Sequence, residues 1–347
     1  MFAEPHRPRI SVVVPAFNGA STLPSCLRAL RESSYPDFEI LVVDDGSGDG
    51  SADLAVPLAD QVIRGDRQRG VAEARNRGAR RATGALLCFV DQDVVVARDT
   101  LEKVARFFEA RPSAAAVTGI LSREHPNADF FSQYKNLYMN YIFSRLPDRV
   151  GFLYGSLYAV RKEAFEDHDP ETLLPDTELG QRLHAAGKEV YFDRGLEVIH
   201  LKKYSMARFF RNDFFIPFVW AEVFVKHRAW KRIGSGGFAH ARRGQLLSLG
   251  LACLTTLSAS AIPLDRRALA PAAGALILWI ALNAGFLRFL RRERGWLYSF
   301  RAWLVTFLDH HVMTAGVLCG MACALAGRRT NRIAADREAQ TESSSQG

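Results

Sequence analysis

Short apolar runs separated by amphipathic segments characterise the N-terminal part of the chain. Leu23, Leu27 and Leu30 share one helix face, behind Ser21 or Thr22 as the N-cap. A strand, a helix and a second strand form a βαβ unit, whose right-handed crossover leaves the strands parallel. The runs that predict strands covered on both faces are 10–14 (ISVVV), 39–43 (EILVV) and 86–90 (LLCFV).

The C-terminal part has longer apolar stretches. Residues 245–263 and 268–287 carry no charge, and each is about long enough to cross a hydrocarbon core of roughly 30 Å. A third stretch, 302–327, has a similar length but contains Asp309, His310 and His311, which makes it a weaker candidate span. Adjacent residues on a helix point in different directions, so we expect snorkelling or a break in the span rather than a ligand site there.

Basic residues flank these stretches and suggest a topology. They crowd the approach to the first span and the loop after the second, which places both on the cytoplasmic side and residues 264–267 outside. Arg328, Arg329 and Arg332 would lie outside after three crossings, so either the tail violates the positive-inside rule or the third stretch does not fully cross. Residues 1–10 contain no apolar signal-peptide core. We therefore predict a multi-pass protein of the cytoplasmic (inner) membrane with its N-terminal part in the cytosol.

Composition narrows the function classes further. The net charge of +8 comes with basic residues that flank the apolar stretches, which favours anionic lipid over nucleic acid as their partner. Five cysteines without a C-x-x-C pair predict reduced, buried thiols rather than disulfides or a zinc site. Residues 209–225 are strongly aromatic and predict an amphipathic helix in the membrane interface, kinked near Pro217; the alternative is a core helix packed on the sheet.

Acidic side chains follow two of the predicted strands. Asp44 and Asp45 come after the second run, and Asp91 and Asp93 come after the third. Ligands of open α/β sheets bind outside the carboxyl ends of parallel strands, so these clusters can converge on one site. Asp91 and Asp93 point to the same side of an extended chain and offer the oxygen ligands that Mg²⁺ or Mn²⁺ prefers.

Six segments between Ile10 and about Leu201 follow one another in a familiar order: 10–18 (ISVVVPAFN), 42–47 (VVDDGS), 70–84 (GVAEARNRGARRATG), 90–93 (VDQD), 154–165 (YGSLYAVRKEAF) and 175–183 (PDTELGQRL). In these segments the chain resembles the GT-A-fold glycosyltransferases of family 2. The resemblance implies an α/β fold with a Rossmann-like sheet, here followed by C-terminal transmembrane helices, and an inverting transfer from a nucleotide-diphosphate sugar.

The same resemblance implies roles on the donor side. Asp93 would coordinate the divalent metal directly, Asp91 would reach the ribose or the metal's water, and His200 falls where some GT-A enzymes place a third metal ligand. The metal would sit on the diphosphate as a Lewis acid. The remaining donor-side residues would be Asp45, which accepts a hydrogen bond from the base's ring N–H, Pro15 and Asn18, which close that pocket, and Arg75, which neutralises the diphosphate.

The acceptor side needs a base that takes the proton from the attacking hydroxyl. The resemblance assigns this role to Asp176, although the family's usual Glu-Asp pair is Pro175-Asp176 here. Glu178 is the fallback. Asp176 or Thr177 could also cap a helix from Glu178 to Ala186 that ends at Gly187.

The sequence therefore predicts a metal-dependent glycosyltransferase that acts on a membrane lipid or lipid-linked, cell-envelope acceptor. A catalytically silent nucleotide-binding scaffold is the alternative, and a nucleotidyltransferase is weaker because residues 15–20 (PAFNGA) lack a Gly-rich phosphate loop. A processive polymerase fits poorly, since 227–230 (HRAW) does not match a Gln-x-x-Arg-Trp segment. The expected segments are a catalytic domain (1–205), interfacial or linker helices (206–243), a transmembrane region (244–327) and a disordered tail (328–347).

Overall fold

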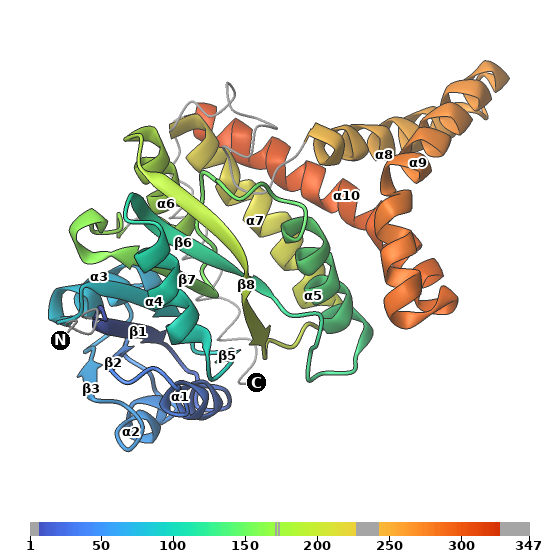
Figure 1. Cartoon of the computed structure of the whole chain (residues 1–347). Helices are drawn as coiled ribbons and strands as arrows, with labels where there is room; N and C mark the ends of the chain where they lie inside the picture. Colours follow the sequence, from blue (N-terminus) through green and yellow to red (C-terminus); the bar gives the residue numbers. More distant parts are fainter. Residues whose placement is uncertain (1–6, 171, 173, 227–242, 327–347) are drawn as a thin grey trace. The chain divides into compact units, whose positions relative to one another are not determined.

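The computed structural model describes residues 7–170, 172, 174–226 and 243–326, and the chain divides into two compact units (Figure 1). The first unit comprises Met1–Ala128 and Ile142–Lys203, and the second comprises Asp129–Tyr141 and Tyr204–Gly347. The predicted basic approach to the first span lies largely outside the described residues, and so does the predicted disordered tail.

An eight-stranded sheet organises the first unit, in the order β3-β2-β1-β4-β7-β6-β8-β5. β1 pairs in parallel with both β2 and β4, which confirms the parallel arrangement that the βαβ pattern predicts. β7 runs antiparallel to β4, so the sheet is mixed. The strands are β1 (Ile10–Ala16), β2 (Phe38–Asp44), β3 (Gln61–Arg64), β4 (Leu86–Val90), β5 (Val94–Val96), β6 (Ala114–Leu121), β7 (Leu157–Arg161) and β8 (Glu189–His200).

Helices pack on this sheet through apolar faces. α1 buries Leu23, Cys26, Leu27 and Leu30, as its spacing predicts. Gly78 in α3 allows close approach to the sheet, because a Cβ there would lie 2.3 Å from a side-chain carbon of Val13. The helices of this unit are α1 (Leu23–Arg31), α2 (Ser51–Ala55), α3 (Val71–Arg81), α4 (Thr100–Ala110), the 3₁₀ turn η1 (Lys162–Ala164) and α6 (Pro175–Ala185).

The second unit is helical. Three of its helices are long and apolar enough to cross a membrane, in the segments Gly244–Ala261, Arg266–Arg294 and Trp296–Leu325. Its elements are α5 (Phe130–Phe143, of which residues up to Tyr141 belong here), α7 (Met206–Lys226), α8 (Arg243–Ala261), η3 (Arg266–Ala268), α9 (Leu269–Arg294) and α10 (Trp296–Leu325).

The third apolar helix corrects one expectation. α10 is continuous through Asp309, His310 and His311, so there is no break, and the first two of these side chains are buried rather than snorkelling outward. Trp279 donates its indole N–H to Nδ1 of His310 at 2.9 Å. A neighbouring helix therefore provides a hydrogen-bond partner for the buried His310, so that this side chain needs neither a break in the helix nor a position at the membrane surface.

Candidate active site

The carboxyl ends of β1 and β2 lie side by side. Ala16 is paired with Asp44, and the backbone N–H of Asp45 donates to the carbonyl of Ala16 at 2.8 Å. The Asp45 carboxylate in turn accepts the backbone N–H groups of Arg69 and Gly70, at 3.0 and 2.7 Å. Burial raises the pKa of Asp45. Asp45 therefore fixes the loop that leads into α3 at the end of β2.

The turn after β1 is held against the same edge. Asn18 has a φ of 45°, in the left-handed region that few residues other than glycine adopt, and its Oδ1 accepts the backbone N–H of Gly48 at 3.0 Å. Pro15 is buried within β1, opposite Val43. The structure thus brings Pro15, Asn18 and Asp45 to one edge of the sheet.

Strand pairing places His200 beside the second acidic cluster. β5 runs antiparallel to β8 with Val94 opposite His200, and Oδ1 of Asp93 lies 3.7 Å from Nε2 of His200. Nδ1 of His200 accepts the backbone N–H of Lys202 at 3.1 Å, so the neutral ring carries its proton on Nε2. Burial lowers the pKa of His200 to about 4. The ring is therefore neutral at neutral pH.

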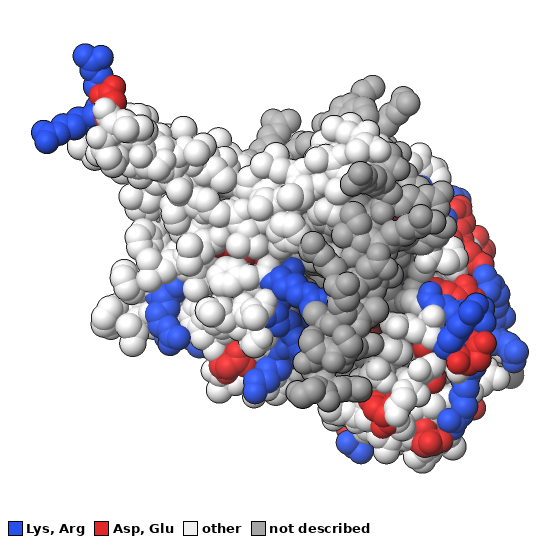
Figure 2. Space-filling model, turned by 180° about the vertical axis from the view of Figure 1, so that it is seen from behind, with Lys and Arg blue, Asp and Glu red and all other residues white. Residues whose placement is uncertain are grey.

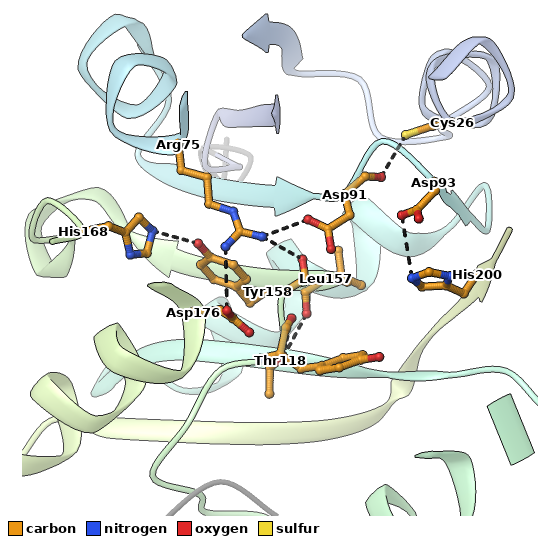
Figure 3. A network of polar contacts seen from close by, with 12 residues as sticks. Cys26, Arg75, Asp91, Asp93, Thr118, Leu157, Tyr158, His168, Asp176 and His200 are labelled. Atoms are coloured by element: carbon orange, nitrogen blue, oxygen red, sulfur yellow. Dashed lines mark hydrogen bonds and ion pairs between the residues drawn. The ribbon is translucent and has the colours of Figure 1, made fainter. Parts of the chain in front are cut away.

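A buried guanidinium joins the two sides of the site (Figure 3). Arg75, on α3, donates to Oδ1 of Asp91 at 2.8 Å, and its other terminal nitrogen lies 3.9 Å from Oδ1 of Asp176. It also lies over the ring of Tyr158, 5.4 Å from the centroid. Arg75 is 3% exposed. Two aspartates therefore share the charge of Arg75, and its role at the diphosphate, which the resemblance implies, stays a prediction.

Asp176 and Glu178 face different partners. α6 begins at Pro175 with Leu174 at the N-cap position, so neither Asp176 nor Thr177 caps the helix; proline at the first helical position needs no N–H partner. Asp176 instead faces Arg75, and burial raises its pKa. Glu178 is buried against Arg182, whose Nε lies 2.9 Å from Oε2. The geometry favours Asp176 over Glu178 as the available carboxylate.

Three residues without an assigned role in the sequence complete the network. The hydroxyl of Tyr158 and Nε2 of His168 share a 3.0 Å hydrogen bond, and burial lowers the pKa of His168 to about 3, so the imidazole is neutral. Gly155 lies so close to both charged partners that an added Cβ would be 3.1 Å from Nη2 of Arg75 and 3.3 Å from Oδ2 of Asp176. Gly155 and Tyr158 lie within segment 154–165, one of the six segments that carry the family resemblance, whereas His168 lies outside all six.

The acidic residues at the end of β4 fit a divalent cation that a ligand helps to hold. Burial raises the pKa of both Asp91 and Asp93, and a bound cation would favour their ionised forms. Within the described part of the chain, no three His, Cys, Asp or Glu side chains surround one metal position. Mg²⁺ commonly uses one or two carboxylates together with substrate phosphates, so this pair matches a metal that arrives with a diphosphate.

Comparisons with known proteins show which family the first unit is similar to. Residues 11–169 match the sequence profile of Glycosyl transferase family 2. Over 123 residues the chain is 36% identical to a PGL/p-HBAD biosynthesis glycosyltransferase of Mycobacterium bovis, covering 33% of this chain and 48% of that protein. Over 118 residues it is 30% identical to the putative teichuronic acid biosynthesis glycosyltransferase TuaG of Bacillus subtilis, covering 33% and 47%. The chain thus spans about half the length of these curated relatives.

A solved structure supports the fold over most of the chain. The mannosyltransferase PcManGT from Pyrobaculum calidifontis superposes with a TM-score of 0.54 at 19% identity, covering 92% of this chain and 88% of that one. The first unit is therefore a GT-A-type α/β domain, as predicted. The part of the chain that matches Glycosyl transferase family 2, residues 11–169, is followed by three described apolar helices.

Proposed function

We propose that this protein is an inverting, metal-dependent glycosyltransferase that moves a sugar from a nucleoside diphosphate donor to a membrane-associated acceptor. The observation that carries the proposal is the shared guanidinium of Arg75, which contacts Asp91 on the metal side and faces Asp176 on the base side. Such a transfer needs both carboxylates within one cleft, one toward the leaving group and one toward the incoming hydroxyl.

Asp176 is the base in this proposal. Its carboxylate would accept the proton of the acceptor hydroxyl as the oxygen attacks the anomeric carbon, and the bond from that carbon to the diphosphate breaks on the opposite face. Burial raises the pKa of Asp176, which makes it a stronger base than an exposed aspartate, while Arg75 favours its ionised form. Gly155 leaves room for these two side chains to approach.

On the donor side, Asp91 and Asp93 would hold Mg²⁺ or Mn²⁺ with the diphosphate, and the bound metal would neutralise the charge that develops on the leaving oxygen. Pro15, Asn18 and Asp45 would line the base pocket. The PcManGT structure is a complex with GDP-Man and Mn²⁺, which supports a nucleotide sugar and a divalent metal here. His200 stays a prediction as a third ligand, because its proton would have to leave Nε2 first.

The acceptor and the location belong to the same proposal. Three described apolar helices follow the residues that match family 2, and the relatives named above are described as glycosyltransferases of PGL/p-HBAD biosynthesis and, putatively, of teichuronic acid biosynthesis. We infer a lipid-linked or envelope-glycan acceptor at the inner membrane, with the catalytic unit on the cytosolic side. The alternative of a catalytically silent scaffold was based on Pro175 in place of the family's usual Glu. This proline takes the first position of α6, and Asp176 beside it faces Arg75.

Calorimetric titration tests the donor site. UDP and GDP would be titrated into the detergent-purified protein with and without Mn²⁺, on the wild type, on Asp93→Asn and on the control Asp99→Asn, which changes an exposed carboxylate paired with Lys103. We expect Mn²⁺-dependent binding of one nucleotide, lost only in Asp93→Asn. A nucleotide affinity that changes neither on addition of Mn²⁺ nor in Asp93→Asn would contradict the proposed metal site. Asp176→Asn should keep nucleotide binding and lose transfer to a lipid acceptor.

A further inference from the structure

α10 has two distinct long faces. Its packed face carries small or polar residues at helical spacing, and its other face is a line of exposed apolar side chains. A helix that lies along a membrane surface and a helix that crosses it can both show such a stripe, so the stripe alone does not decide the topology. The packed residues include Ala302, Thr306, Asp309, Met313, Gly316 and Gly320; the exposed ones include Leu297, Phe300, Leu304, Leu308, Leu318 and Leu325.

A charged cluster lies at the middle of α10. Lys135 of α5 forms an ion pair with Asp213 of α7, and Asp309 of α10 is in side-chain contact with Asp213. All three helices belong to the second unit. At 1.5 Å per residue, α10 is about 45 Å long and Asp309 lies about 20 Å from its start. A symmetric crossing would therefore bring Lys135, Asp213 and Asp309 near the bilayer midplane, where ionisable side chains are rare and costly.

The direction of α7 gives an independent argument. A Cβ on Gly316 would lie 2.2 Å from the carbonyl oxygen of Phe214, and one on Gly320 would lie 2.2 Å from that of Phe218. Residue numbers thus rise together along the two helices, which are parallel and side by side, as Figure 1 also shows. Residues 214–218 of α7 must therefore lie at the same membrane depth as residues 316–320 of α10.

This parallel packing is incompatible with a crossing by α10. Suppose that α10 crossed the bilayer outward, starting from the basic C-terminal end of α9. Because α7 is parallel to α10 and packs beside it, the C-terminal end of α7 would then also lie on the outer side. The following segment would then have to return to the cytoplasmic side before α8, and that segment carries Lys226, Arg228, Lys231, Arg232, Arg242 and Arg243. If all four helices crossed in turn, α7 and α10 would be antiparallel.

The α8–α9 hairpin, in contrast to α10, has the features of a membrane crossing. Its flanks expose apolar side chains, and charge reappears at its tip, where Arg266 and Arg267 follow Asp265. Figure 2 shows a white projecting surface with blue and red atoms at its end. At its other end, α9 finishes with exposed Arg288, Arg291 and Arg292. This is the charge distribution of a hairpin that crosses from a basic cytoplasmic side.

We propose that, of the described helices, only α8 and α9 cross the bilayer, and that α10 lies with α5 and α7 along its cytoplasmic face, with the exposed apolar side chains of α10 in the lipid headgroup region. This α5–α7–α10 platform binds the lipid surface of the membrane. The two crossings leave Arg328, Arg329 and Arg332 on the cytoplasmic side, in accord with the positive-inside rule. The inference rests on the membrane location and cytosolic catalytic unit of the proposed function.

Single-cysteine labelling tests this topology in a bacterial host. In a background without the native cysteines, Leu264→Cys reports the hairpin tip, Ser344→Cys reports the tail, and Glu32→Cys, on the exposed end of α1, reports the catalytic unit. An impermeant maleimide should label the tip only in spheroplasts, and the tail and Glu32→Cys only in inverted vesicles. Labelling of the tail in spheroplasts, or of the tip in inverted vesicles only, would overturn the inference.

A second measurement avoids the cysteine substitutions. Green fluorescent protein fused after Gly347 of the wild-type chain should fluoresce, whereas alkaline phosphatase at the same position should be inactive. The reverse pattern would overturn the two-crossing topology. Neither readout uses sugar transfer, so loss of transferase activity with the expected topology would reject the proposed function alone.

Discussion

Replacing Arg75 by methionine tests whether its charge holds the site together. The substitution keeps an apolar stem but leaves Asp91 and Asp176 facing each other without a cation. Arg75 is 3% exposed and contacts Asp91, whose side chain is 30% exposed, at 2.8 Å, so the substitution removes the buried partner of a partly buried pair. Such removals destabilise by about 3–5 kcal/mol.

Arg80 on the same helix provides the matched control. It is 54% exposed and pairs with Asp167 and Glu73 at the surface, where such pairs contribute about 0–1 kcal/mol. We therefore expect Arg75→Met to lower the free energy of unfolding of the first unit by at least about 2 kcal/mol more than Arg80→Met does, in the absence of metal and nucleotide.

Hydrogen exchange measured by mass spectrometry is the suitable assay. Intrinsic fluorescence would report the wrong unit, because the five tryptophans are residues 220, 230, 279, 296 and 303. The slowest amides in peptides that cover β1 and β4 report global opening of the first unit. A loss of 3–5 kcal/mol should accelerate their exchange by about two to nearly four orders of magnitude.

The pH dependence supplies a second check. Burial already raises the pKa of Asp91 and of Asp176, and loss of the guanidinium raises both further. A carboxyl whose folded pKa is raised destabilises the fold when it must ionise, so the effect of Arg75→Met should be larger near about pH 8 and shrink as the pH falls through the raised pKa values. Equal exchange in Arg75→Met and Arg80→Met, or a penalty that grows in acid, would refute the ion-pair argument.

Three further outcomes can be measured on the purified enzyme. Because burial raises the pKa of Asp176, turnover should fall as the pH drops through a value above the usual 3.8, and a rate that stays level to the ordinary aspartate pKa would exclude this base. Glu178→Gln should lower the thermal midpoint of the first unit but keep most turnover, since Glu178 is buried in a structural ion pair; loss of turnover comparable to that of Asp176→Asn would make Glu178 the base instead. Gly155→Ala should lower kcat about tenfold with little change in nucleotide affinity, because the new Cβ displaces Arg75 and Asp176 by a few tenths of an ångström, and unchanged kinetics would show that their spacing is not critical.

Much of the first unit could be predicted because its determinants are local. Apolar runs of five residues and the Leu23, Leu27 and Leu30 spacing give strands and a helix directly, and chirality then makes the strands parallel. Asp45, Asp91 and Asp93 could be placed at one edge of the sheet for the same reason. The three apolar helices follow from length and composition alone.

Only the tertiary structure shows which side chains contact the predicted site residues. Arg75 on α3 meets Asp176 on α6 only because β4 and β7 pair, and no local pattern encodes that pairing. Likewise, β5 pairs with β8 and so brings His200 beside Asp93.

For the apolar C-terminal helices, too, the sequence predicted the elements but not their contacts. Sequence identified α10 as apolar and Asp309 as unusual within it, but the partners of Asp309 come from helices far away in the chain. Hydrophobic periodicity reports which face of an element is buried, and it carries no information about which distant element covers that face. The parallel course of α7 and α10, on which the topology depends, exists only in the folded protein.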